Sequence, residues 1–143
     1  MSTVQTWDNL YATAFHLAKK AHDGARRKYT DEPYFLHPLR VSEGTRDIRL
    51  KIVALLHDVL EDTPKYTSEI KLKFPECIFE LLDAVTRQHG ETYDEFIDRI
   101  KYHKNPDARV IKILDIKDNL SKLPEGDKLQ KRYLKALEEL TNV

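Results

Sequence analysis

Apolar residues recur along most of this chain at the spacing of an α-helix. In residues 7–24, Leu10, Ala14 and Leu17 follow one another at three or four positions, and Gly24 is a typical helix stop. Residues 25–35 are polar and irregular, which predicts a loop. The helical spacing returns in a short helix that starts near His37, and in helices over 47–59, 68–74, 75–87, 96–103, 105–123 and 128–140.

Several of these helices have capping residues at their predicted starts. Thr67 is placed to cap the helix over 68–74, and Pro75 to occupy the first turn of the next helix. Thr92 and Glu95 have the spacing of a capping box. The chain has no internal repeat, low-complexity segment or linker. We therefore expect an all-α fold, with residues 1–143 forming a single compact domain of about eight helices.

Composition narrows the class of protein. A chain of 143 residues with 41% hydrophobic and 34% charged residues fits one globular domain. Lys and Arg number 24, as do Asp and Glu, and this balance argues against generic binding to nucleic acid or to an anionic membrane. No apolar run is long enough to span a bilayer, and residues 1–10 lack the apolar core of a signal peptide. A cytoplasmic location is expected.

The sequence contains one cysteine, Cys77, so an internal disulfide cannot form. It lies in the segment PECIFELL, whose pattern indicates the core side of a predicted helix. We expect it to be a small, buried apolar side chain.

The segment LLHDVLEDT, residues 55–63, ends an apolar helix with four groups that bind metals or carry protons. His57 and Asp58 diverge by about 100° on a helix, so both reach one ion only if it lies between their directions or near the helix end. Glu61 lies one turn beyond His57 on nearly the same face. A metal ion held by His57 and Asp58 would therefore have Glu61 or Asp62 close by for proton transfer.

A second candidate is the segment RVIKILDIKDNL, residues 109–120. Apolar residues mark one face of this helix, and a polar stripe marks another: Lys112, Asp115, Asn119 and Lys122. Such a stripe lines either solvent or a cavity. In the first case Asp115 forms a solvated ion pair with Lys112, which contributes little to stability.

A third candidate is His37 in the segment PYFLHPLRV, where it lies among apolar residues. On its own, such a histidine is usually a core or capping residue. Taken with His57, Asp58 and Asp115, it completes a set of two nitrogen and two carboxylate ligands. Mixed imidazole and carboxylate ligation suits Mn²⁺ or Fe²⁺, with Zn²⁺, Mg²⁺, Ni²⁺ and Co²⁺ as alternatives. Positions left open on such an ion can hold a nucleophilic water. The remaining histidines have no acidic partner pattern: His16, His22, His89 and His103.

Four segments carry a family resemblance that covers nearly the whole chain: AHDGARRKYTDEPYFLHPLRV (21–41), ALLHDVLEDT (54–63), AVTRQHGETYDEFIDRI (84–100) and VIKILDIKDNLSKL (110–123). The order His, His-Asp, Asp resembles the HD superfamily of metal-dependent phosphohydrolases. The chain most resembles the hydrolase domain of RelA/SpoT homologues, and among these the small stand-alone alarmone hydrolases. The first two segments are the most specific.

The resemblance implies a role for individual residues. Glu61 and Asp62 match the acidic pair that handles the nucleophilic water and its proton. Arg27 and Lys28 match the basic pair that grips the guanine nucleotide, and Asn119 matches an asparagine near the substrate. Four residues match the ligands of the metal ion, usually Mn²⁺: His37, His57, Asp58 and Asp115. Further candidates for phosphate contacts are Arg87, Lys112, Lys128, Arg132 and Tyr133.

The resemblance also implies a reaction, the removal of the 3′-pyrophosphate of guanosine tetra- or pentaphosphate to give GDP or GTP. We expect no synthetase domain in a chain of this length. The chain departs from the family at Asp118, where a histidine or tyrosine is common, and at Ile116 and Lys117, where a basic-apolar pair is common. Alternatives are therefore a 5′-nucleotidase, a phosphatase for 3′-phosphorylated nucleotides or NADPH, and a sensor that binds the alarmone without cleaving it.

Overall fold

The computed structural model describes residues 5–142, and this part of the chain forms eight α-helices and one 3₁₀ turn. The helices are α1 (Trp7–Ala21), α2 (Leu36–Glu43), α3 (Ile48–Asp62), α4 (Thr67–Lys73), α5 (Glu76–Ala84), α6 (Tyr93–Lys101), α7 (Asp107–Lys122) and α8 (Lys128–Thr141). The prediction of an all-α fold is confirmed. Extended segments pair once among the described residues, at an isolated bridge between Arg26 and Pro33. The signal-peptide prediction falls partly on residues 1–4, outside the described residues.

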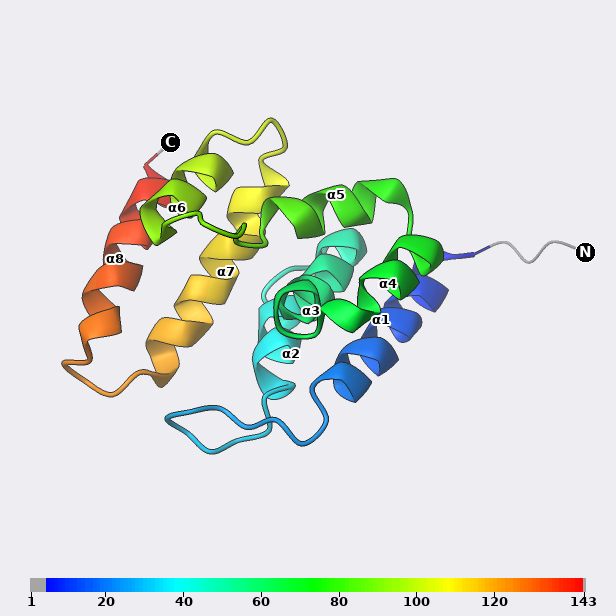
Figure 1. The fold of residues 1–143 in the computed structure, drawn as a ribbon, viewed down its shortest axis with the longest axis horizontal. Coiled ribbons are helices and arrows are strands. Elements are labelled where there is room, and N and C mark those ends of the chain that lie inside the picture. Colours follow the sequence, from blue (N-terminus) through cyan, green and yellow to red (C-terminus); the bar gives the residue numbers. More distant parts are fainter. Residues whose placement is uncertain (1–4, 143) are drawn as a thin grey trace, which may run out of the picture.

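Helix α3 is the centre of the core and packs against α1, α2, α5 and α7. In Figure 1, α1, α4 and α5 lie at one end of the molecule and α6, α7 and α8 at the other. Because neighbours cover α3 on several sides, its apolar residues are not confined to one stripe. The segment just before the His-Asp pair is fully buried, as the sequence predicted: Val53, Ala54, Leu55 and Leu56.

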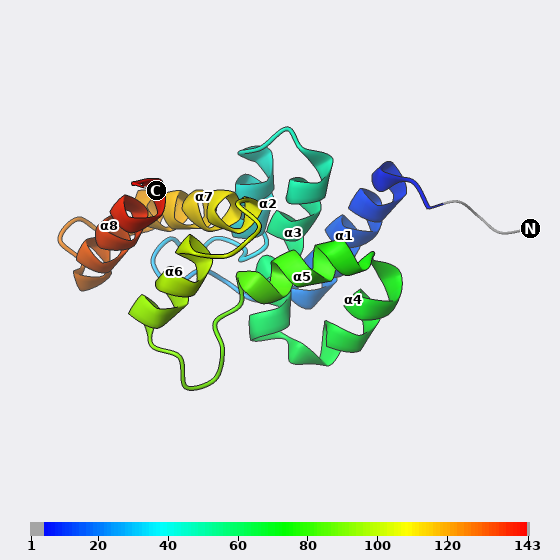
Figure 2. The ribbon, with the colours of Figure 1, turned by 90° about the horizontal axis from the view of Figure 1, so that it is seen from above.

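Helix α7 joins the two ends of the molecule, since it contacts α2 and α3 as well as α6 and α8 (Figure 2). Gly44, which follows α2, allows α7 to approach closely. A Cβ added at Gly44 would lie 2.8 Å from Cδ2 of Leu114 on α7. This close packing matters because α2 carries His37 and α7 carries Asp115.

The predicted loop between α1 and α2 folds back on itself and reaches toward α7 (Figure 1). The N–H of Arg27 donates to the carbonyl of Glu32 over 2.9 Å, and the N–H of Tyr34 donates to the carbonyl of Ala25 over 2.8 Å. Asp31 turns the chain with a positive φ of 52°. These bonds give the loop a fixed shape, so its side chains can take part in a site.

Several helix boundaries differ from the predictions. Helix α3 continues to Asp62, three residues beyond the predicted end. Thr67 does not cap α4 but is its first residue, because the 3₁₀ turn Pro64–Tyr66 leads directly into the helix. Pro75 is the N-cap of α5, and this helix ends at Ala84 instead of residue 87. The capping box of Thr92 and Glu95 is confirmed.

The prediction for Cys77 is wrong, since the side chain is exposed. The buried residues of α5 begin at Ile78, and Cys77 lies in the first turn beside the exposed Pro75 and Glu76. Within the described residues, no helix combines the length and apolar character needed to cross a membrane.

Candidate metal centre

Four side chains from three helices converge beside the core, and we call them the metal cluster: His37 of α2, His57 and Asp58 of α3, and Asp115 of α7. One ligand atom of each lies within 4.8 Å of the ligand atoms of the other three, an arrangement that could hold a metal ion. Nε2 of His37 lies 2.8 Å from Oδ1 of Asp115, and Nε2 of His57 lies 3.2 Å from the same oxygen. Oδ2 of Asp58 lies 3.5 Å and 3.3 Å from these two nitrogens.

The charges around the metal cluster favour a cation at its centre. Burial alone would lower the pKa of His57, but the carboxylates of Asp58 and Asp115 outweigh burial and raise it to about 9. Burial is likewise outweighed at His37, where hydrogen bonds to Asp115 and Asp118 raise the pKa. Both imidazoles thus gain a proton readily beside the carboxylates. A divalent ion would supply the same positive charge, and two nitrogens with two carboxylate oxygens are suitable ligands for it.

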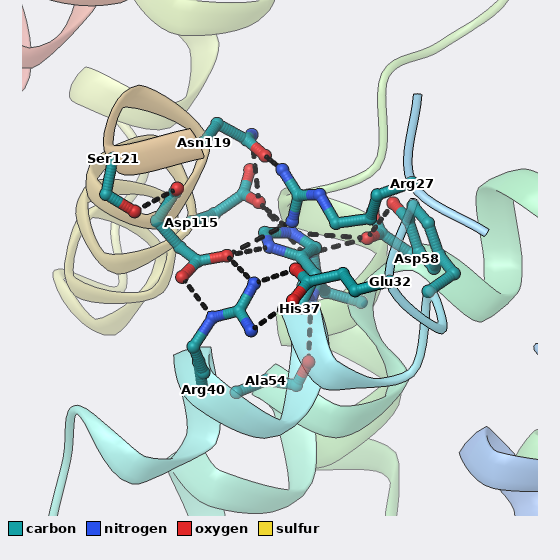
Figure 3. A network of polar contacts seen from close by, with 12 residues as sticks. Arg27, Glu32, His37, Arg40, Ala54, Asp58, Asp115, Asn119 and Ser121 are labelled. Atoms are coloured by element: carbon teal, nitrogen blue, oxygen red, sulfur yellow. Dashed lines mark hydrogen bonds and ion pairs between the residues drawn. The ribbon is translucent and has the colours of Figure 1, made fainter. Parts of the chain in front are cut away.

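The second ring nitrogen of each histidine is also occupied. Nδ1 of His57 bonds to the carbonyl oxygen of Ala54, one turn earlier in the same helix. Nδ1 of His37 lies 2.7 Å from Oδ2 of Asp118, which belongs to α7 (Figure 3). An acceptor at Nδ1 keeps the proton there and leaves Nε2 free to bind a metal.

The two carboxylates of the cluster have partners of their own. The Tyr34 hydroxyl donates to Oδ2 of Asp58 over 2.7 Å. Nζ of Lys112 donates to Oδ2 of Asp115 over 2.8 Å. Burial would raise the pKa of Asp115, but the charges of Lys112 and His57 outweigh it and hold the pKa well below its usual range. Asp115 is only 4% exposed, so this ion pair lies in a buried site and the solvated alternative is wrong.

A pocket of about 250 Å³ opens beside the metal cluster, and we call it the central pocket. Asp58, Glu61 and Asp62 form its acidic side. Removal of water from around Glu61 and Asp62, followed by the charge of Asp58, raises the pKa of both carboxyls, that of Asp62 to about 6. Glu61 and Asp62 lie in the last turn of α3, so they project into the pocket one turn beyond the cluster.

The central pocket is also lined by cations. They are Arg87, Lys112 and Arg132, and Tyr93 and Tyr133 line the pocket as well. The guanidinium of Arg132 lies 4.7 Å from the centre of the Tyr93 ring. The pocket can therefore hold an anion between basic side chains and a metal ion. Lys128 is not among the lining residues.

A second pocket, which we call the side pocket, measures about 290 Å³ and shares three residues with the central pocket: Tyr34, Asn119 and Tyr133. Arg27, Lys28 and Tyr29 line it as well. The Arg27 guanidinium donates to Oδ2 of Asp118 over 3.1 Å and to Oδ1 of Asn119 over 3.0 Å. The structure thus brings the predicted substrate-binding residues next to the predicted metal ligands.

Two further residues lie near the centre and were not expected there from the sequence. His22 had no acidic partner pattern, yet its side chain is 5% exposed and its ring centre lies 4.9 Å from that of Tyr34. Arg40 contacts both Glu32 and Asp118. The contact between Arg40 and Asp118 joins positions 78 residues apart, so no local pattern indicates it.

The profile of the HD domain family matches residues 14–109, which include His37, His57 and Asp58. Among curated proteins, the guanosine-3′,5′-bis(diphosphate) 3′-pyrophosphohydrolase of Aquifex aeolicus is 35% identical over 122 residues, covering 77% of this chain and 17% of that protein. The enzyme of the same name from Borreliella burgdorferi is 41% identical over 53% of this chain and 12% of its own length. The bifunctional (p)ppGpp synthase/hydrolase SpoT of Escherichia coli is 31% identical over 100 residues, which cover 67% of this chain and 13% of that protein.

The chain thus spans less than a fifth of the length of these curated relatives. Among solved structures, a metazoan ortholog of SpoT that hydrolyzes ppGpp is similar to this chain with a TM-score of 0.76. The match covers 99% of this chain and 87% of that protein at 23% identity, so the two share a fold.

Proposed function

Because this chain belongs to the HD-domain family, we propose that it is a metal-dependent hydrolase that removes the 3′-pyrophosphate of guanosine tetra- or pentaphosphate. Residues 1–143 would form one catalytic domain. The observation that carries this proposal is the junction of two pockets, one beside the metal cluster and one lined by Arg27 and Lys28. Curated relatives named for this activity support the choice of substrate.

Mn²⁺ is the ion that we propose for the metal cluster. His37 and His57 would bind it through Nε2, and Asp58 and Asp115 through a carboxylate oxygen. Four protein ligands leave positions open on a six-coordinate ion. When bound, such an ion lowers the pKa of a water molecule and draws electron density from a phosphate oxygen.

Glu61 would orient the attacking water and accept its proton, with Asp62 beside it. The raised pKa of Glu61 brings this carboxyl closer to neutral pH, which suits a general base. The water oxygen would form a bond to the phosphorus attached to O3′ of the ribose, and the bond between this phosphorus and O3′ would break. O3′ takes up a proton, and the products are pyrophosphate and GDP or GTP.

The cations of the central pocket would balance the charge that develops on the phosphates. Lys112, Arg132 and Arg87 line the same pocket as Glu61 and Asp58. Guanosine would then extend into the side pocket. There Arg27 and Lys28 would grip the nucleotide, and Asn119, which both pockets share, would lie close to the ribose.

A substrate panel tests this proposal. The full chain with Mn²⁺ is incubated with guanosine tetraphosphate, a 5′-mononucleotide or NADPH, and released pyrophosphate and phosphate are measured separately. Asp58→Ala protein, purified in parallel, reports contaminating phosphatases. We expect pyrophosphate from guanosine tetraphosphate alone. Phosphate from the mononucleotide or NADPH, without pyrophosphate from the tetraphosphate, would assign the centre to another HD phosphohydrolase. Tight binding of the tetraphosphate without turnover would make the chain a sensor.

A further inference from the structure

Asp118 precedes Asn119, which lines both pockets, and it accepts hydrogen bonds from three basic side chains. Its Oδ2 lies 2.7 Å from Nδ1 of His37 and 3.1 Å from the Arg27 guanidinium. Its Oδ1 accepts from Nε of Arg40 over 2.7 Å. The side chain is 10% exposed, and hydrogen bonds to His37 and Arg40 outweigh burial and hold its pKa well below the usual range. Asp118 is therefore a buried carboxylate with a full set of partners.

We propose that Asp118 is a positioning residue, which fixes His37 for metal binding and Arg27 for nucleotide binding through the same carboxylate. The inference rests on the proposed function in taking His37 as a metal ligand and Arg27 as a nucleotide contact. A carboxylate that accepts from Nδ1 fixes the ring orientation of a ligating histidine and makes the other nitrogen a better donor to the metal. His57 receives only a neutral carbonyl at that position.

The surrounding charges explain why a carboxylate fits here. Arg40 also donates to Glu32, over 2.6 Å, so Arg40 lies between two carboxylates (Figure 3). Arg27 and His37 both contact Oδ2 of Asp118. A neutral residue at position 118 would leave Arg27 and Arg40 facing each other without the charge that separates them. The residue types common at this position in the resembling family, histidine and tyrosine, carry no negative charge there.

Because one carboxylate holds both side chains, metal binding and nucleotide binding should be coupled. Arg27 is 12% exposed and has two fixed acceptors, Asp118 and Asn119. Loss of the Asp118 charge would release Arg27 and the ring of His37 together. A single substitution at position 118 should therefore weaken both metal binding and nucleotide binding, whereas a purely structural residue would lower stability alone.

Metal affinity tests the proposal without any turnover. Mn²⁺ binding to the metal-free full chain is measured by competition with a fluorescent chelator for the unaltered protein, Asp118→Ala and Asp118→Asn. We expect roughly ten- to a hundredfold weaker binding in both variants. Glu32→Gln is the matched control, because it removes a charge from Arg40 but leaves His37 untouched, and its affinity should stay within about threefold. Circular dichroism establishes that each variant is folded, and the isosteric Asp118→Asn serves where Asp118→Ala does not fold.

A second readout reports the ring of His37 directly. In Zn²⁺-loaded protein with ¹⁵N-labelled histidine, the unaltered chain should show a slowly exchanging Nδ1–H signal that is absent from Asp118→Ala and present in Glu32→Gln. Unchanged Mn²⁺ affinity and an unchanged Nδ1–H signal in a folded Asp118 variant would overturn the proposal. Failure of the unaltered chain to bind Mn²⁺ would contradict the proposed function instead.

Discussion

The two sides of the metal cluster are built in different ways. Helix α3 supplies His57 and Asp58 from adjacent positions, and His57 is held by the carbonyl of Ala54 in the same helix. On the other side, His37 and Asp115 are 78 residues apart and meet only where α2 packs against α7. One side of the site therefore follows from a single helix, whereas the other depends on the packed fold.

This difference predicts different consequences of substitution. Substitution of the acids of α3 should abolish catalysis and leave the fold intact, since the apolar residues of this helix, and not its acids, form its contacts with the core. Changes on the side of α2 and α7 should act through Asp118 on metal and nucleotide together.

Asp58→Ala should have the largest effect. Loss of one ligand on α3 should reduce hydrolysis of guanosine tetraphosphate by at least about a thousandfold, because several kcal/mol of transition-state stabilisation depend on the metal. Initial rates and circular dichroism measure the two parts of this prediction. Glu80→Ala, at an exposed position of α5, is the control and should keep full activity. Full activity in Asp58→Ala would contradict the assignment of the ligands.

Glu61→Gln should separate proton transfer from metal binding on the same helix. We expect kcat to fall by about a hundred- to ten-thousandfold, because a positioned general base is lost. Mn²⁺ affinity should stay close to that of the unaltered protein, since Glu61 is outside the metal cluster. Steady-state kinetics and chelator competition give the two values. A loss of Mn²⁺ binding equal to that in Asp58→Ala would make Glu61 a ligand instead of a base.

Arg27→Ala tests the other side of the site. We expect KM to rise about tenfold, which corresponds to about 1.4 kcal/mol, with a much smaller change in kcat. The guanidinium lies in the side pocket and contacts Asp118 and Asn119, away from Glu61. Steady-state kinetics with guanosine tetraphosphate measure both constants. An unchanged KM with a large loss of kcat would mean that Arg27 acts at the reacting phosphate.

The smallest effect concerns stability and pH. The pKa of Asp62 is raised from 3.8 to about 6, so the folded metal-free protein binds this proton more tightly than the unfolded chain. The carboxyl therefore destabilises the fold as pH rises from about 4 to above 6. The free energy of unfolding of Asp62→Asn, relative to that of the unaltered protein, should therefore increase from pH 4.5 to pH 7.5. After allowance for solvent screening, the increase should be on the order of 1 kcal/mol. Urea unfolding at both pH values measures this, and an equal difference at the two values would contradict it.

The geometry of the α3 side could be predicted from the sequence because its information is local. The segment LLHDVLEDT contains two of the predicted ligands and both predicted acids, and helical spacing alone places Glu61 one turn beyond His57. The all-α class followed in the same way from the 3.6-residue spacing of apolar residues. The boundary errors at Thr67 and Pro75 arose because a 3₁₀ turn and an N-cap proline have nearly the same residues as a regular helix start.

The other side could not be worked out from periodicity. His37 and Asp115 were grouped because their residue types suited a metal, and the family resemblance supported this choice. Asp118 was noted only as a departure, since its contacts with Arg27 and Arg40 span 91 and 78 residues. Nothing in the polar stripe of α7 distinguishes a cavity from solvent until α2 and the loop before it are in place. Cys77 was misassigned because the apolar residues of its helix begin only at Ile78, and Cys77 lies in the exposed first turn after Glu76.

The role of the metal cluster in hydrolysis is best tested on the metal-stripped full chain, incubated with guanosine tetraphosphate with and without added Mn²⁺. Ion-exchange chromatography separates the nucleotide from its products. We expect GDP and pyrophosphate in equal amounts, and only when Mn²⁺ is present. Intact tetraphosphate in a protein that has bound Mn²⁺ would contradict the proposed substrate, and equal hydrolysis without Mn²⁺ would contradict the role of the metal cluster.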